Sequence, residues 1–268
     1  MNLNSSKDVI LKSRAQWYHY EVVLSVFVSH SGNISKLYVQ GASPNMAKIT
    51  RGRNLKDFKS QQASADVGKL RIIGGQFRGR QIEYSGDPVT RPMKDLTREA
   101  CFNLVGGFMP GKVAFDLFAG TGAIGLEALS RGAAFSFLIE RHIPTVRIVQ
   151  KNVQLLEVEA KTEVACSDTF FWVKEFLNTP EKWPSEPWVV FCCPPYALFE
   201  EQKDNLLITL HALADVAPDE SVFLVESDQR FDTSELPDFL SWQTRHYSPA
   251  FISMAHKTSN VEPDSIFM

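Results

Sequence analysis

From Val113 onward, the chain alternates between short apolar runs and longer segments whose apolar residues recur at helical spacing. A short apolar run between turn signals is typical of a buried strand, and apolar positions three and four residues apart are typical of a helix. The pattern predicts strands at residues 113–118, 135–140, 163–166, 188–192 and 221–226, and helices at residues 123–131, 145–156, 169–177 and 200–214. This order predicts an α/β fold with a mostly parallel sheet, helices on both faces and ligands at the carboxyl ends of the strands.

Further elements flank this core. Upstream, Leu70–Ile73 and Phe77–Tyr84 surround a Gly-Gly turn and predict a basic β-hairpin. The segment Asp95–Val105 follows with apolar residues on one side and ends at two glycines, so it predicts a helix. Downstream, residues 242–247 and 251–256 are predicted to form a closing hairpin.

Residues 1–66 differ from the rest, because Ser, Asn, Gly and Lys are frequent and only Tyr18–Val28 has the pattern of a strand. Two interpretations stay open. The segment is a poorly ordered or irregular extension that holds basic residues near RNA, or translation begins at Met46 and residues 1–45 are not made. We therefore divide the chain into an extension, the hairpin and an α/β domain, at residues 1–66, 67–90 and 91–268.

Charge is distributed unevenly along the chain. Residues 46–100 hold twelve Lys and Arg against six Asp and Glu, a balance of +6 that leaves −9 for the rest of a chain whose net charge is −3. A basic segment joined to an acidic body is typical of a surface that binds a polyanion such as RNA. A solvated surface with no ligand would have the same composition.

The cysteines and the apolar run near the N-terminus argue against a metal-binding protein and a membrane protein. Four cysteines lack metal-ligand spacing and include no C-x-x-C, so we expect no metal site and a reducing, cytoplasmic location. The apolar run Val22–Val28 is too short to span a bilayer, so no membrane association is expected.

A Gly-rich turn follows the strand at residues 113–118. Gly120, Gly122 and Gly125 have the spacing G-x-G-x-x-G, which lets the backbone approach a ligand while the next helix offers free N–H groups. The spacing also occurs in proteins that bind NAD or FAD, so a dinucleotide remains an alternative.

Three carboxylates lie at strand ends: one fits either ligand, and the other two favour S-adenosylmethionine over a dinucleotide. Glu140 ends the second strand, where a carboxylate can accept hydrogen bonds from ribose hydroxyls. Asp116, just before the Gly-rich turn, would attract the cationic amino acid end of S-adenosylmethionine and repel a pyrophosphate. Asp168, after the third strand, offers an acceptor for an adenine amino group.

The fourth strand leads directly into Cys193-Pro194-Pro195-Tyr196. Two prolines stiffen this loop, which can then hold a backbone carbonyl toward a substrate amine while Tyr196 stacks on a base. Enzymes that methylate amino groups of nucleobases carry a similar Asx-Pro-Pro-aromatic motif. Cys193 replaces its first residue, and since a thiol is a weak hydrogen-bond acceptor, the loss would cost on the order of 10²- to 10³-fold in rate.

Taken together, these motifs resemble the bacterial 16S rRNA guanine-N2 methyltransferases. The resemblance covers about Leu70–His256 and leaves the first quarter of the chain uncovered. It is carried by residues 70–75 and 77–80, by Thr90-Arg91-Pro92, Asp95, Arg98-Glu99 and Phe102-Asn103, by the run from Asp116 to Gly132, and by Glu140, Asn152, Pro194-Pro195-Tyr196 and Val225-Glu226-Ser227.

The resemblance implies a Rossmann-like class I methyltransferase, with a mostly parallel seven-stranded sheet and a preceding β-hairpin that contacts RNA. It places Cys193 in the position of the catalytic Asp, beside Pro194 and Pro195, and stacks the guanine on Tyr196. The implied cofactor-binding residues are Asp116, Phe118, Gly120, Gly122, Glu140 and Asp168. The implied RNA-binding residues are Arg71, Arg78, Arg80, Arg91 and Arg98.

The leading functional hypothesis is transfer of a methyl group from S-adenosylmethionine to the N2 amine of a guanine in 16S rRNA, free or in an assembling small ribosomal subunit. We expect the protein to act as a monomer. One alternative is a catalytically weakened or inactive RNA-binding homologue, because Cys193 replaces the motif Asp. A third is an adenine-N6 DNA methyltransferase, against which no separate DNA-recognition region is visible in the sequence.

Overall fold

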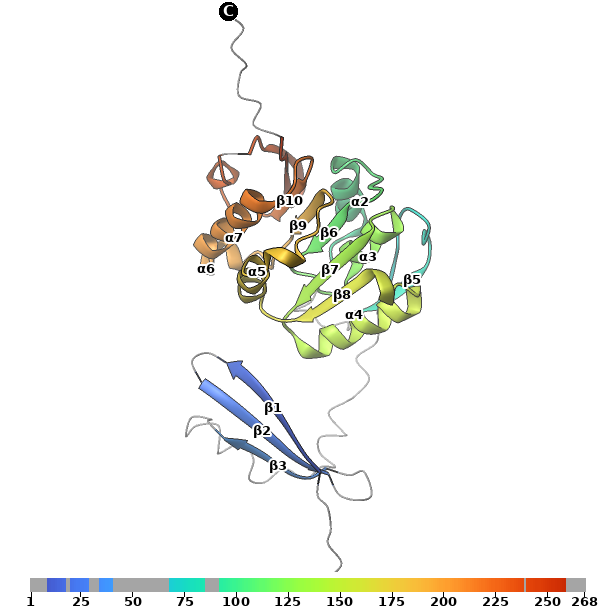
Figure 1. Cartoon of the computed structure of the whole chain (residues 1–268). Coiled ribbons are helices and arrows are strands. Elements are labelled where there is room, and N and C mark those ends of the chain that lie inside the picture. Colours follow the sequence, from blue (N-terminus) through green and yellow to red (C-terminus); the bar gives the residue numbers. More distant parts are fainter. Residues whose placement is uncertain are drawn as a thin grey trace, which may run out of the picture. The chain divides into compact units, whose positions relative to one another are not determined.

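The structure of the chain is a computed structural model that describes residues 9–17, 20–28, 34–40, 68–84, 92–238 and 240–258 (Figure 1). It divides into two units, Met1–Ala63 and Ser64–Met268, and each unit is described here by itself.

The first unit contains an antiparallel sheet of three strands in the order β1-β2-β3. These are β1 (Val9–Trp17), β2 (Tyr20–Val28) and β3 (Ile34–Gln40). The sequence predicted one strand in this part of the chain, at Tyr18–Val28, which overlaps β2. The first strand was not predicted because polar residues interrupt its apolar alternation. A strand that is stabilised by pairing with its neighbour need not have a periodic sequence.

The second unit is built on a seven-stranded sheet in the order β11-β12-β10-β9-β6-β7-β8. The strands from β10 to β8 are parallel, and β12 pairs antiparallel with both β10 and β11. The predicted fold class is therefore confirmed. The bounds are β6 (Val113–Asp116), β7 (Phe135–Glu140), β8 (Thr162–Cys166), β9 (Trp188–Cys192), β10 (Val222–Ser227), β11 (Gln243–Tyr247) and β12 (Ala250–His256).

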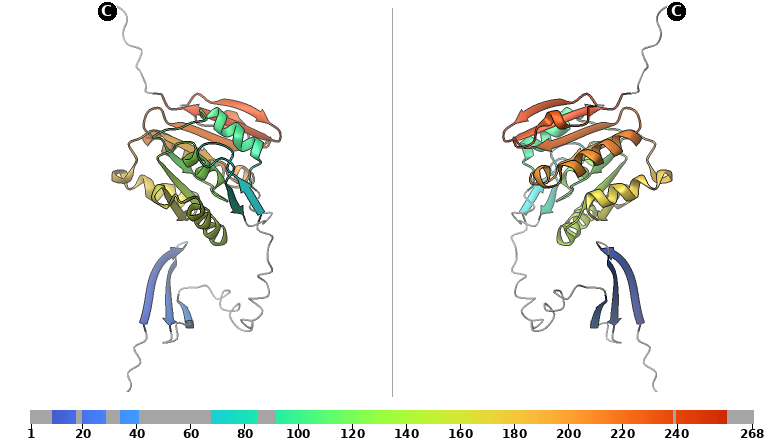
Figure 2. Two further views of the ribbon diagram at one scale, coloured as in Figure 1. Left: turned by 90° about the vertical axis from the view of Figure 1, so that its right-hand side faces the viewer. Right: turned by 90° about the vertical axis from the view of Figure 1, so that its left-hand side faces the viewer.

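Helices cover both faces of this sheet (Figure 2). Successive side chains of a strand point to opposite faces, so in β9 Val189 and Phe191 join one apolar core while Trp188 and Val190 join the other. The first core is closed by α2 (Asp95–Leu104), α3 (Ala123–Ser130) and α4 (Ile143–Leu156). The second is closed by α5 (Thr169–Leu177), α6 (Leu198–Glu201) and α7 (Lys203–Val216).

Among residues 92–238, which the structure describes, three single-turn helices lie in the connections, namely η2 (Glu159–Lys161), η3 (Pro180–Lys182) and η4 (Thr233–Glu235). Among the residues that the structure describes, no helix is long and apolar enough to cross a membrane.

The predicted hairpin is formed by β4 (Gly68–Arg71) and β5 (Gln81–Tyr84), which pair antiparallel. The second strand is shorter than predicted because the residues after Gly75 form a turn, in which Gly79 has a φ of 83°. The hairpin is packed onto the main unit: Ile72 and Ile82 are buried in the first core. Asn152 of α4 also accepts a hydrogen bond from Glu83 N and donates one to Glu83 O, each at 2.8 Å.

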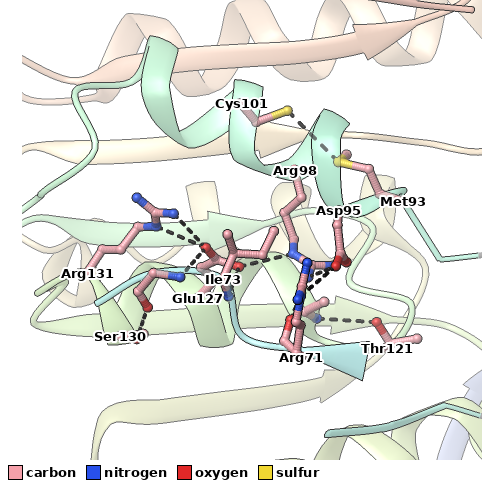
Figure 3. A network of polar contacts seen from close by, with 12 residues as sticks. Arg71, Ile73, Met93, Asp95, Arg98, Cys101, Thr121, Glu127, Ser130 and Arg131 are labelled. Carbon is pink, nitrogen blue, oxygen red and sulfur yellow. Dashed lines mark hydrogen bonds and ion pairs between the residues drawn. The ribbon is translucent and has the colours of Figure 1, made fainter. Parts of the chain in front are cut away.

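A buried carboxylate, Glu127 of α3, connects the hairpin to α2 (Figure 3). It accepts hydrogen bonds from Ile73 N at 3.2 Å and Gly74 N at 3.1 Å. It also accepts from Arg98 Nε and Arg131 Nε, each at 3.0 Å. Because a buried charge must be paired to be tolerated, this network fixes the position of the hairpin on the domain.

Candidate active site

A cavity of about 710 Å³ opens at the carboxyl ends of the parallel strands. Its walls include the Gly-rich turn after β6, the end of β7, the start of α5, the loop after β9 and the end of β10. This is the edge where α/β sheets bind ligands, and the volume is within the usual range for a small-molecule or cofactor site.

The Gly-rich turn depends on two glycines for different reasons. Gly122 precedes α3 with a φ of 78°, a left-handed conformation that favours glycine. A Cβ on Gly125 would lie 2.0 Å from Leu138 Cδ2, so only glycine lets the first turn of α3 pack on β7. Gly120 lines the cavity, whereas Gly122 lies behind it.

Glu140 and Asp168 both line the cavity, and each also holds backbone in place. Glu140 accepts hydrogen bonds from Gly120 N at 3.0 Å and from His142 N at 2.7 Å. It therefore fixes the Gly-rich turn to the end of β7. Asp168 caps α5, with Oδ1 accepting from Phe170 N at 3.0 Å. Phe118 packs edge-on against Phe170 with ring centroids 6.3 Å apart, and both rings line the same wall.

Asp116 lies beneath the Gly-rich turn and is not part of the cavity wall. Its Oδ2 accepts a hydrogen bond from Gly125 N at 3.0 Å, and its buried Oδ1 has no partner among the described residues. Burial raises the pKa of Asp116 to about 7, against the stabilising bond from Gly125 N. A buried carboxylate just beneath the cavity wall can attract the cationic group of a ligand such as S-adenosylmethionine across the Gly-rich turn, without contacting it.

The Pro-Pro-Tyr loop follows β9 and lines the cavity with Cys193, Pro194, Pro195 and Tyr196. The carbonyls of Pro195 and Tyr196 accept hydrogen bonds from Leu198 N and Phe199 N, which start α6. The carbonyl of Pro194 accepts no hydrogen bond from the part of the chain that the structure describes. This is the carbonyl that the sequence motif assigns to the substrate amine.

Cys193 is half-buried in the same loop, and its thiol is held in the neutral form. Burial raises the pKa of Cys193 well above its ordinary value, and the nearby Glu226 carboxylate raises it further. A neutral thiol is a weak hydrogen-bond acceptor, so Cys193 is a poor substitute for the oxygen of Asp or Asn.

Glu226, near the end of β10, is a residue to which the sequence analysis gave no role. It lines the cavity and its Oε1 accepts a hydrogen bond from the Tyr196 hydroxyl at 2.8 Å. Burial raises its pKa, partly opposed by the hydrogen bond from Tyr196. The available signal was a carboxylate at the end of a predicted parallel strand, which is where such sites form.

The arginines predicted to bind RNA have different environments. Arg71, Arg78 and Arg80 are exposed on the hairpin, and Arg91 lies outside the described residues. Arg98 is an exception: its side chain is 0% exposed and is bound to Glu127, Asp95 and Arg71 O. The buried Arg98 side chain therefore offers no surface to RNA in this structure. The sequence did not reveal this, because composition reports charge and not burial.

The fold and the cavity define a class I methyltransferase. Residues 70–254 match the family described as Conserved hypothetical protein 95, and the chain belongs to this family.

Relatives and solved structures agree with this family assignment. The chain is similar to Ribosomal RNA small subunit methyltransferase D of Escherichia coli, with 37% identity over 163 residues, 60% of this chain and 76% of that protein. The protein of the same name from Haemophilus influenzae is 31% identical over 56% of this chain and 76% of its own length. The solved structure of yhhF from Escherichia coli superposes with a TM-score of 0.57 and 29% identity, over 71% of this chain and 99% of that one.

Proposed function

We propose that this protein transfers a methyl group from S-adenosylmethionine to the exocyclic N2 amine of a guanine in 16S rRNA. The observation that carries the proposal is the cavity itself, in which the Gly-rich turn and the Pro-Pro-Tyr loop face the same space. The names of the relatives supply the substrate class, small-subunit ribosomal RNA.

The cofactor would lie against the Gly-rich turn. Glu140 is suited to the ribose hydroxyls, Asp168 to the adenine amine, and Phe118 to packing on an aromatic base. When bound, S-adenosylmethionine supplies the electrophilic methyl group. The unpaired Oδ1 of Asp116 would attract its ammonium group, which would favour the charged form of this carboxyl.

The Pro-Pro-Tyr loop would hold the guanine. The free carbonyl of Pro194 accepts one N–H of the amine, and the Tyr196 ring stacks on the base. Alignment of the amine in a cavity with little water is the main contribution that this loop can make to the rate.

The hairpin would bind the RNA backbone. Arg78 is exposed in the turn, and Lys69 and Arg71 are exposed along β4. Since the hairpin is fixed to α2 and α3 through Glu127, it presents these charges from a rigid support. A basic surface of this kind can contact the phosphates of an RNA substrate.

The test is incubation of purified protein with S-adenosylmethionine labelled in its methyl group and with small-subunit particles that lack the guanine-N2 mark. We expect label in 16S rRNA as N2-methylguanine after digestion to nucleosides. Protein that binds no cofactor and leaves the particles unlabelled would overturn the proposal. A Cys193→Asp version is assayed beside it.

The second candidate is an RNA-binding homologue with weak or no activity, and the neutral thiol of Cys193 favours it. Label from the Cys193→Asp version alone would select this second function. Equal label from both proteins would show that the thiol is tolerated and that another group positions the amine.

A further inference from the structure

We propose that Glu226 recognises the target base as guanine, by accepting hydrogen bonds from the N1–H and the N2 amine of a base stacked on Tyr196. This inference rests on the proposed function and assigns base specificity within the same cavity.

The first argument is the position of Glu226 relative to the loop. In the parallel pair of β9 and β10, Val225 is in register with Cys192. The next residues along the chain, Glu226 within β10 and Cys193 just after β9, therefore lie at the same level of the sheet, and both line the cavity. The carboxylate is consequently placed beside the position where the motif normally has Asp.

The second argument is unused hydrogen-bonding capacity. The Tyr196 hydroxyl donates to Oε1 of Glu226, and among the described residues no group donates to Oε2. Glu226 is 9% exposed. Once a ligand excludes water from the cavity, an unpaired Oε2 would therefore carry a large desolvation cost, which a hydrogen bond from the ligand would offset.

The third argument is the chemistry of the bases. Guanine presents two adjacent donors, N1–H and the N2 amine, which match the two acceptor oxygens of a carboxylate. Adenine presents an acceptor at N1, which a carboxylate repels. Two matched hydrogen bonds to a base edge discriminate by roughly 5- to 150-fold.

The hydrogen bond between Tyr196 and Glu226 links stacking on the base to recognition of its edge. The ring that would stack on the base and the carboxylate that would read its edge are held together at 2.8 Å. Burial keeps the carboxylate in a site where hydrogen bonds to a ligand are stronger than in water.

The test uses binding of free mononucleotides to protein saturated with S-adenosylhomocysteine, followed by NMR titration. We expect the wild-type chain to bind guanosine monophosphate about tenfold or more tightly than adenosine monophosphate. The 2-aminopurine nucleotide keeps the amine but has an acceptor at N1, so it should bind as weakly as adenosine monophosphate. This comparison of ligands needs no variant to fold.

The matched variant is Glu226→Gln, whose amide offers one acceptor and one donor, the pattern that adenine requires. We expect the preference for guanosine monophosphate to disappear or reverse while affinity for S-adenosylhomocysteine is unchanged. Tyr196→Phe keeps the ring and removes the hydroxyl that holds the carboxylate, so we expect it to keep the preference for guanine but to reduce its size.

Two results would overturn the inference: wild-type protein without a preference for guanosine monophosphate, or a Glu226→Gln variant with an unchanged preference. If either result were obtained while rRNA still acquired labelled N2-methylguanine, only the role of Glu226 would be refuted and the proposed function would stand. Protein without cofactor binding or methylation would refute the proposed function instead.

Discussion

Arg98 Nε donates a hydrogen bond to Glu127 Oε2 at 3.0 Å, and neither side chain is exposed to solvent. Removing one partner of a buried ion pair costs about 3–5 kcal/mol when the other charge is left unpaired, but Arg131 would still pair with Glu127 at 2.8 Å. We therefore predict that Arg98→Met lowers the free energy of unfolding by about 3 kcal/mol, the lower end of this range, as measured by urea denaturation.

The control is the exposed ion pair between Lys203 and Glu235, whose side chains are each 39% exposed. Lys203→Met should leave the urea midpoint unchanged, because exposed pairs are screened by solvent. If Arg98→Met were as stable as this control, the Glu127 network would not be what fixes the hairpin.

The buried carboxyl of Asp116 should make stability depend on pH. Burial raises its pKa to about 7 from 3.8, so between these values the folded chain binds a proton that the unfolded chain has lost. The stabilisation of the folded state by this proton is fully present below about pH 4 and is lost as pH rises through about 7. The loss in the free energy of unfolding is at most about 4 kcal/mol. Asp116→Asn, which keeps an acceptor for Gly125 N, should abolish this loss.

Asp232 provides a control of opposite sign. The hydrogen bond from Ser234 N lowers the pKa of this carboxyl, so its contribution is present above its unfolded pKa and is lost as pH falls. Thermal unfolding of the wild type, Asp116→Asn and Asp232→Asn from pH 2 to 8 measures the two slopes, because the lowered pKa of Asp232 places its loss of stability below about pH 4. Parallel curves for wild type and Asp116→Asn would contradict the buried, protonated state.

The thiols of Cys193, in the Pro-Pro-Tyr loop, and of Cys166 should differ in their rates of alkylation. Only the thiolate is alkylated, and burial raises the pKa of Cys193 well above its ordinary value, while Cys166 is exposed. At pH 8 we predict that iodoacetamide modifies Cys193 more than about tenfold more slowly than Cys166, as followed by peptide mass spectrometry. Equal rates would indicate a reactive thiolate in the loop.

The sequence predicted most of the fold because its strands are short apolar runs and its helices have clear periodicity. The predictions for Trp188–Cys192 and Thr169–Leu177 are confirmed to the residue. The helix predicted at residues 200–214 begins earlier, at Leu198, and is interrupted at Gln202, where φ is −141°. Its apolar spacing continues across the interruption, so periodicity alone could not locate it.

The site was less predictable than the fold. Glu226 received no role because the sequence does not state that β10 lies beside β9, and only that adjacency brings its carboxylate to Tyr196. The resemblance placed Arg98 among the RNA-binding residues, and the sequence does not show whether such a side chain is exposed or buried. In both cases the missing information is tertiary, since it depends on which elements pack together.

The last prediction concerns RNA binding by the hairpin. Arg78 is exposed, and its guanidinium has no hydrogen bond or ion pair within the described residues. Arg80 instead donates a hydrogen bond to Leu155 O and lies over the Phe77 ring, 5.6 Å from its centroid. Arg78→Ala should therefore weaken RNA binding and lower the dependence of log affinity on log salt by about 0.7–0.9, the value for one phosphate contact.

Arg80→Ala should have a mixed effect, since it also removes the contact between the hairpin and α4 and so lowers the thermal midpoint. Filter binding of 16S rRNA at several salt concentrations, with cofactor affinity measured in parallel, distinguishes the two variants. An unchanged salt slope for Arg78→Ala would remove Arg78 from the RNA-binding surface. The rigid support provided by Glu127 predicts that cofactor affinity stays constant in Arg78→Ala, because this side chain lies outside the cavity wall.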